Sequence, residues 1–330
     1  MKMKINNKQI KSLFLLSLVG SNLAKEESSN NQTEIAHSNE INLNSLPQLG
    51  VNLTDAKITD ENSSEQIDFF AGYPISIENQ RNCTTSYALI ISDCQDAGKN
   101  GFITSSRCCV NCNGVDNISG QDGSLLGSSL YSSIVPLPPR YPSDLPLDYL
   151  YINANLPGIN VKFLPYVAGL TNNDQTVSEI YPIASSWKLT ETGFKVCAYG
   201  AKNGYFCGNL TEINIGIIGV NGSFRELNTV EMGENDFNFK PGVNLGNENL
   251  GAPVYLADSY KNVGHPTARL LGHITLIENT DWATKHFWYT PIDTVLQDLG
   301  KKANNCVFKL LIDEASAKEF QSQIEVPTKT

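Results

Sequence analysis

Short apolar runs separated by turn residues dominate the chain from residue 67 onward. Dense apolar runs rich in β-branched and aromatic residues are typical of strands, and few stretches repeat apolar positions with the period of a helix. The pattern predicts an all-β barrel or sandwich. The expected strands include Tyr87–Ile91, Asp148–Ile152, Val161–Leu164, Trp187–Leu189, Leu210–Val220, Val254–Leu256 and Leu270–Leu276.

One helix is expected near the C-terminus. Thr290 is placed to cap it, and Pro291 stands at the first helical position, where its missing N–H has no helical partner in any case. Gly300 is expected to end the helix. Its apolar stripe consists of Ile292, Val295, Leu296 and Leu299.

Two pairs of cysteines bracket expected β-hairpins. The sequence VCAYGAKNGYFCG, residues 196–208, carries Cys197 and Cys207 with two glycines between them. Glycine allows the positive φ of a tight reversal, so this stretch indicates two strands joined by a turn and closed by a disulfide. Cys83 and Cys108 bracket a second expected hairpin and could close it in the same way.

The first 24 residues have the pattern of a secretion signal, because lysines precede the short apolar run Leu13–Val19 and Ala24 offers a small residue for cleavage. Residues 25–67 are polar and have few aromatics, so we expect a disordered leader or propeptide. An even number of cysteines, eight, suits an oxidising compartment, and we expect a secreted, extracellular glycoprotein. Glycosylation sequons begin at Asn31, Asn52, Asn62, Asn82, Asn117, Asn209 and Asn221.

Charge and hydropathy exclude two classes of partner. A net charge of −10 argues against binding to nucleic acid, and after the signal no apolar run is long enough to span a membrane. No metal and no cofactor are expected.

Four motifs in order resemble the chymotrypsin-type serine proteases, nearest the alpha-lytic protease and streptogrisin branch. The resemblance covers residues 68–300 and implies two six-stranded antiparallel β-barrels with a peptide-binding cleft between them. It also implies the disulfides Cys83–Cys108 and Cys197–Cys207, and it leaves residues 301–330 as a C-terminal extension. The motifs are Phe69–Ile77, Gly101–Cys108, Val196–Gly208 and Gly251–Tyr255.

The resemblance places unsuitable residues at two positions of the Ser-His-Asp triad. The histidine position falls on Arg107, whose guanidinium stays protonated near neutral pH and cannot act as a base. The nucleophile position falls on Leu250, which has no lone pair. The aspartate position falls on Asp148, with Asp144 as a weaker match.

The neighbours of Leu250 also depart from the family pattern. Asn249 stands where the family has an acid, and Glu248 stands where it has a glycine whose N–H helps to form the oxyanion hole. A carboxylate there would oppose a developing negative charge. The sequence therefore predicts a protease homologue without protease activity, a monomer that binds a peptide or protein in the former cleft. The residues expected to line that cleft are Gly272, His273, Ile274 and Thr275.

Two other functions remain open. Ser105 or Ser106 could pair with His273 in a relocated serine hydrolase, which requires hydrogen-bond contact between them. A structural extracellular glycoprotein would use only the stability of the barrels. We also expect an ion pair between Arg107 and Asp148, since the resemblance brings these positions into contact; a closed pair with a filled cleft favours the structural function, and an open, aromatic-lined cleft favours binding.

The remaining cysteines allow more than one arrangement. A zinc site formed by Cys94, Cys108, Cys109 and Cys112 is less expected than disulfides in a secreted chain. If the two implied disulfides form, Cys94, Cys109, Cys112 and Cys306 pair among themselves in one of three ways.

Overall fold

The structure is a computed structural model, and it describes most of the chain from residue 67 to residue 318. The expected signal, residues 1–24, and the leader, up to residue 66, lie outside the described residues. The described ranges are 67–77, 81–92, 100–109, 117–120, 123–132, 145–154, 160–169, 180–219, 222–233, 244–258, 267–279, 284–303 and 306–318.

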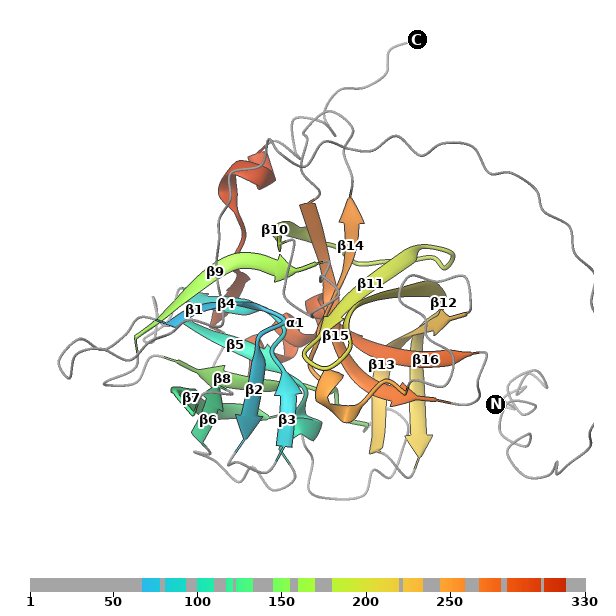
Figure 1. Ribbon diagram of the computed structural model, residues 1–330, viewed down its shortest axis with the longest axis horizontal. Coiled ribbons are helices and arrows are strands. Elements are labelled where there is room, and N and C mark those ends of the chain that lie inside the picture. The colour runs from blue at the N-terminus through green and yellow to red at the C-terminus, as the bar shows by residue number, and fades with distance from the viewer. Residues whose placement is uncertain are drawn as a thin grey trace, which may run out of the picture. The chain divides into compact units, whose positions relative to one another are not determined.

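Strands make up most of the described chain (Figure 1). They are β1 (Ile67–Ala71), β2 (Pro74–Ile77), β3 (Arg81–Thr84), β4 (Ala88–Ser92), β5 (Asn100–Thr104), β6 (Asn117–Gly120), β7 (Leu125–Ser132), β8 (Leu150–Asn153), β9 (Val161–Ala168), β10 (Ile180–Ser186), β11 (Lys195–Gly200), β12 (Gly204–Gly219), β13 (Gly222–Met232), β14 (Pro253–Asp258), β15 (Thr267–Glu278), β16 (Lys285–Pro291) and β17 (Val307–Leu310). The helical elements include the 3₁₀ turns η2 (Ser106–Cys108) and η4 (Asn247–Asn249), the helix α1 (Ile292–Lys302) and a short helical stretch at 314–318.

The C-terminal half forms a closed barrel. Its strands pair in the order β14-β11-β12-β13-β16-β15, and β15 pairs again with β14. All of these pairings are antiparallel. Because β15 pairs with both β14 and β16, the six strands form one closed ring. These strands carry the yellow to orange colours in Figure 1.

The N-terminal half forms the second barrel, with the order β3-β2-β6-β7-β8-β5-β4. β3 and β4 act as one interrupted strand, because the residues between them bond to both neighbours. The Thr85 N–H donates to the Tyr73 oxygen at 2.9 Å, and the Ser86 N–H donates to the Ile103 oxygen at 2.7 Å. Counted this way, the barrel also has six strands, and the predicted pair of six-stranded barrels is confirmed.

Both implied disulfides are present in the structure. Cys197 lies directly opposite Cys207 in the β11–β12 hairpin, and Cys83 on β3 is bonded to Cys108 at the end of η2. Cys109 and Cys306 are also disulfide-bonded. Cys94 and Cys112, the other two cysteines whose pairing the sequence left open, lie outside the described residues.

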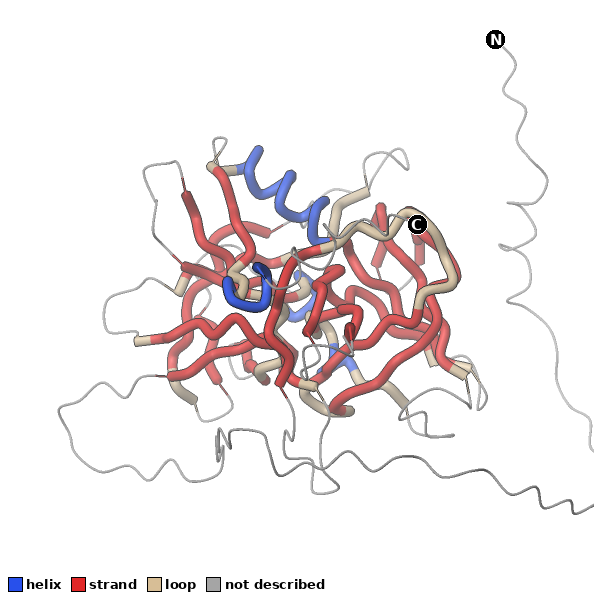
Figure 2. The backbone as a smooth tube through the Cα atoms, turned by 90° about the horizontal axis from the view of Figure 1, so that it is seen from above, coloured by secondary structure: helices blue, strands red, loops and turns tan. Residues whose placement is uncertain are grey.

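The C-terminal segment packs on the strands, and Figure 2 shows the helix along their outside. Three residues of the predicted stripe, Ile292, Val295 and Leu299, are buried, and β17 pairs with β4. Within the described residues, no helix has the length and apolar character needed to cross a membrane.

Three local predictions are wrong. Thr290 does not cap α1, because it is a buried residue of β16 whose hydroxyl bonds to the hydroxyl of Thr275 at 2.7 Å. The cap position is Pro291, and the helix continues past Gly300 to Lys302. The expected strand at 187–189 is not a strand, since β10 ends at Ser186.

Candidate functional site

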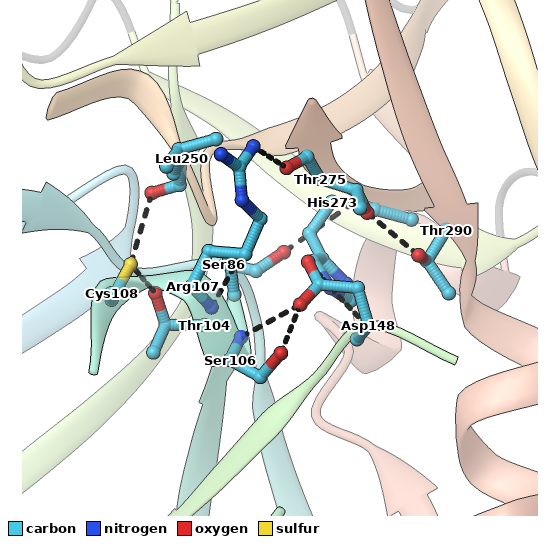
Figure 3. Close-up of polar contacts among 12 residues, drawn as sticks. Ser86, Thr104, Ser106, Arg107, Cys108, Asp148, Leu250, His273, Thr275 and Thr290 are labelled. Atoms are coloured by element: carbon cyan, nitrogen blue, oxygen red, sulfur yellow. Dashed lines mark hydrogen bonds and ion pairs between the residues drawn. The ribbon is translucent and has the colours of Figure 1, made fainter. Parts of the chain in front are cut away.

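Arg107 lies at the junction of the two barrels. It sits in η2, directly after β5, and its backbone N–H donates to the hydroxyl of Ser105 at 3.2 Å. The disulfide of the next residue, Cys108, fixes the end of this turn. From there the half-buried side chain reaches the second barrel, where Nη1 donates to the main-chain oxygen of Thr275 on β15 at 3.1 Å (Figure 3).

Asp148 is fully buried just before β8. Its Oδ1 accepts hydrogen bonds from the backbone N–H of Ser106, at 2.9 Å, and from the Ser106 hydroxyl. Its Oδ2 has no hydrogen-bond donor among the described residues, and the Nε2 of His273 lies 3.7 Å away. The carboxylate is therefore held on one side by a serine and faces an imidazole on the other.

The expected ion pair between Arg107 and Asp148 is wrong. The ion pairs among the described residues do not include it, and in Figure 3 the guanidinium extends toward Thr275 while the carboxylate faces Ser106. The physical reason is that Ser106 supplies two donors to Asp148 from within the same turn. Ser106 as the partner of Asp148 was missed, although a serine beside the histidine position was noted as a candidate nucleophile.

His273 is buried against the first barrel. Its Nε2 lies 2.7 Å from the main-chain oxygen of Asp148, and because a carbonyl only accepts, Nε2 carries the proton. Its Nδ1 has no hydrogen-bond partner among the described residues. The ring of buried Tyr87 lies 6.2 Å from the imidazole, and burial, followed by the charge of Asp293, raises the pKa of Tyr87. The position of Tyr87 beside His273 was not predicted, because in the sequence Tyr87 is only the first residue of an expected strand.

Leu250 is a core residue at the end of η4, with 2% of its surface exposed. Its backbone N–H donates to the oxygen of Asn247 at 3.0 Å, and the N–H of Asn249 donates to the oxygen of Gly246 at 3.1 Å. A protease oxyanion hole needs the nucleophile's N–H to point at the substrate. At Leu250, this N–H is used inside the turn.

The side chain of Asn249 fixes the turn to the β11–β12 hairpin. Its Nδ2 donates to Oδ1 of Asn203 at 2.6 Å, and its Oδ1 accepts from the Asn203 N–H at 3.3 Å. Gly200 makes room for this amide, because a Cβ at that position would lie 2.0 Å from Asn249 Oδ1.

Thr84 joins three parts of the site. Its hydroxyl donates to the main-chain oxygen of Glu248 at 2.7 Å and accepts from the N–H of Ala201 at 2.9 Å. The carboxylate of Glu248 forms an ion pair with Lys202 at 3.3 Å. The turn that contains Leu250 is thus held by β3 and by the hairpin turn at once. Apart from its place next to Cys83, nothing in the sequence distinguishes Thr84 from other threonines.

The residues expected to line a cleft have buried side chains. Gly272, His273, Ile274 and Thr275 are all buried in β15, and the Thr275 hydroxyl bonds to Thr290. Thr275 contacts Arg107 through its main-chain oxygen alone. The strand therefore meets Arg107 with a main-chain oxygen and Asp148 with the side chain of His273.

The chemistry available at this site is limited. The hydroxyls of Ser105 and Ser106 are buried, and the Ser106 hydroxyl bonds to Asp148. Among the described residues, no group of three or more His, Cys, Asp or Glu side chains is arranged to hold a metal ion, and Cys108 is consumed by its disulfide. The arrangement suits main-chain hydrogen bonding and packing better than proton transfer.

No family model and no curated relative match the sequence. Solved structures do match the fold. Thermobifida fusca protease A is 15% identical over 74% of this chain and 100% of its own, with a TM-score of 0.51. Nocardiopsis protease is 14% identical over 74% of this chain and 98% of its own, with a TM-score of 0.50. The chain therefore has the chymotrypsin-like serine protease fold.

Proposed function

We propose that this protein is a secreted, catalytically inactive homologue of chymotrypsin-like proteases, and that it binds an extended peptide or protein segment where its barrels meet. The observation that carries the proposal is the state of Leu250. Its side chain is buried, and its N–H bonds to Asn247 within the turn. A site of this kind offers neither a nucleophile nor an oxyanion donor at the position where the family needs both.

The proton-transfer groups support the same proposal. Arg107 occupies the position of the base, and a guanidinium remains charged near neutral pH. The Ser106 hydroxyl donates to Asp148, so its hydrogen bond goes to a carboxylate instead of an imidazole. In a working triad the imidazole lies between serine and aspartate. This order and the burial of Ser106 argue against a relocated serine hydrolase.

Peptide binding follows from the fold by analogy. The structures with this fold are proteases, which act on extended polypeptide chains, and fold analogy alone is weaker than a site argument. This chain adds one local feature, since the main-chain oxygen of Thr275 at the barrel junction accepts a hydrogen bond from a side chain of the other barrel. Main-chain groups of this kind bind extended peptides without regard to their sequence.

Secretion and glycosylation belong to the same proposal. All disulfides in the described region require an oxidising compartment. The first asparagines of three sequons, Asn82, Asn117 and Asn209, are exposed on strands, where a glycan would not disturb the core. These features are equally expected of a purely structural glycoprotein, so binding decides between the two functions.

Labelling with a fluorophosphonate probe tests the loss of catalysis. The natural protein is expected to remain unlabelled under conditions in which Thermobifida fusca protease A reacts completely. The variant Arg107→His/Leu250→Ser is expected to label much more slowly than that control, because the Leu250 N–H stays bonded to Asn247. Adding Glu248→Gly to this variant should increase the labelling rate, since the turn loses its ion pair with Lys202.

One outcome would overturn the inactive assignment. Labelling of the natural protein that disappears in Ser106→Ala or Ser105→Ala, with both variants still folded, would identify a relocated nucleophile. Labelling of the double variant at the rate of the control protease would leave the inactive assignment standing but would show that the turn readily adopts the catalytic conformation.

A further inference from the structure

One glycosylation sequon of this chain includes a cysteine that forms a disulfide. It consists of Asn82, Cys83 and Thr84 on β3, and Cys83 is bonded to Cys108, which follows 25 residues later. The other sequons in the sequence have no cysteine at any of their three positions. Glycosylation and disulfide formation therefore use the same short stretch of chain at Asn82 and at no other sequon.

In the folded protein this sequon is closed to modification. A glycosyltransferase that reads Asn-x-Ser/Thr sequons has to reach the hydroxyl of the third residue in an unpaired stretch of chain. Thr84 is fully buried, and its hydroxyl bonds to the Glu248 oxygen at 2.7 Å and to the Ala201 N–H at 2.9 Å. Asn82 itself is exposed, but its strand is paired with β2. The glycan therefore has to be added before the chain folds.

Two reactions compete for this stretch when the chain enters an oxidising compartment. In glycosylation, Nδ2 of Asn82 bonds to the anomeric carbon of a lipid-linked oligosaccharide, the lipid diphosphate leaves, and the amide gives up one proton. In disulfide formation, the thiols of Cys83 and Cys108 pass two electrons and two protons to a disulfide oxidant by thiol–disulfide exchange. Synthesis at about 5–20 residues per second delivers Cys108 about 1–5 s after Cys83, and disulfides form over seconds or longer.

We propose that Asn82 is glycosylated only until Cys83 pairs with Cys108, so that the rate of this closure sets the fraction of chains that carry the glycan. The inference rests on the proposed secretion and glycosylation and adds the regulation of one site. The disulfide is the earlier of the two barriers, because the partners of Thr84 lie 117 and 164 residues further along the chain. Both reactions fall within the same few seconds, so about half of the chains are expected to carry the glycan.

The two forms of the protein differ beside the candidate site. Asn82 lies two residues before Thr84, a distance of about 7 Å along a strand. The Thr84 N–H donates to the oxygen of Leu250 at 3.0 Å, so the glycan is attached close to the turn that contains Leu250. The side chain of Asn82 is exposed, so both forms reach the same fold. Disulfide closure thus decides whether this turn has a glycan next to it.

Translation of the full-length chain with endoplasmic-reticulum microsomes tests this competition, and mass spectrometry after N-glycosidase treatment gives the occupied fraction of each sequon. The key variant is Cys108→Ser, which prevents the disulfide and leaves all three residues of the sequon unchanged. The matched control is Cys207→Ser, which removes the disulfide to Cys197 and also leaves the sequon unchanged. Dithiothreitol added during translation of the natural chain prevents the disulfide without any substitution. Because the glycan is added before folding, the result does not require the variants to fold.

We expect Cys108→Ser to raise the occupied fraction at Asn82 about twofold, from about half of the chains to nearly all, and dithiothreitol to do the same. Cys207→Ser should leave this fraction at the value of the natural chain. Full occupancy of Asn82 in the natural chain, no rise in Cys108→Ser, or an equal rise in both variants would overturn the competition, while a glycan at Asn209 would leave the proposed secretion intact. If no asparagine carries a glycan under any condition, both the competition and the proposed glycosylation fail.

Discussion

Replacing Thr84 with valine tests the network that holds the Leu250 turn. Valine keeps the shape of threonine but removes the hydroxyl that donates to Glu248 and accepts from Ala201. Two main-chain groups then lose their partner, and each unpaired buried group costs about 1–3 kcal/mol. Because Glu248 and Ala201 are only half-buried, we take the lower part of this range and expect Thr84→Val to lower the free energy of unfolding by about 2–4 kcal/mol.

The neighbouring residue offers a matched control. Thr85 is as buried as Thr84, but its hydroxyl donates to the Tyr73 oxygen, which also accepts the Thr85 N–H. Removing this hydroxyl leaves no group unpaired, so Thr85→Val should cost only about 1 kcal/mol. Both values come from urea unfolding followed by tryptophan fluorescence, and an unchanged denaturant slope shows that the variants unfold in the same way.

The same pair of variants has a local readout. Thr84→Val should raise the rate of hydrogen exchange at the N–H groups of Asn249 and Leu250, because the turn opens more often. Thr85→Val should leave those rates unchanged. Equal costs for the two variants, or unchanged exchange in Thr84→Val, would refute the reasoning that Thr84 holds the turn.

Two further results are expected. Burial raises the pKa of Tyr149, and the hydrogen bond to Asp298 raises it further. The folded state therefore holds the Tyr149 proton more tightly than the unfolded chain does. The protonated Tyr149 contributes fully to stability below pH about 10, and this contribution is lost as the pH rises further. Urea unfolding between pH 8 and pH 11 should therefore show a decline that is shallower in Tyr149→Phe by up to about 1.4 kcal/mol per pH unit, and equal slopes would contradict this. Protein secreted from a eukaryotic host should lose mass on treatment with an N-glycosidase, and Asn209→Gln should remove one glycan; an unchanged mass would exclude glycosylation.

The cysteines and the glycines between them made much of the fold predictable. A β-hairpin closed by cross-strand cysteines is a local feature, so residues 196–208 carry their own signal, and the apolar stripe of α1 does the same. The strand β13 was missed because its sequence, GSFRELNTVEM, has no dense apolar run, and it also contains Glu226 with a positive φ of 57°. Its partner β12 has the same irregularity at Asn214, with a φ of 54°.

The site was predictable only in part. The resemblance to the family's motifs singled out Arg107, Asp148 and Leu250. The contacts of these residues depend on segments that are far apart in the sequence and could not be predicted. Threonine and serine bond equally well to many partners, so nothing local assigns Ser106 to Asp148 or Thr84 to Glu248. The expected ion pair of Arg107 was wrong for the same reason, because opposite charges were matched without knowing that Ser106 supplies two donors to one oxygen of the Asp148 carboxylate.

The pairing of β17 with β4 has a consequence for synthesis of the chain. Phe308 lies opposite Ile91, so a strand near the C-terminus covers the edge of β4 in a sheet whose other strands come from the first half of the chain. The first barrel emerges from the ribosome long before the strand that covers its β4 edge. During that interval the edge is open to pairing with other chains. Proteins truncated before residue 306 should therefore be more prone to aggregation than the full chain, although both barrels would be present.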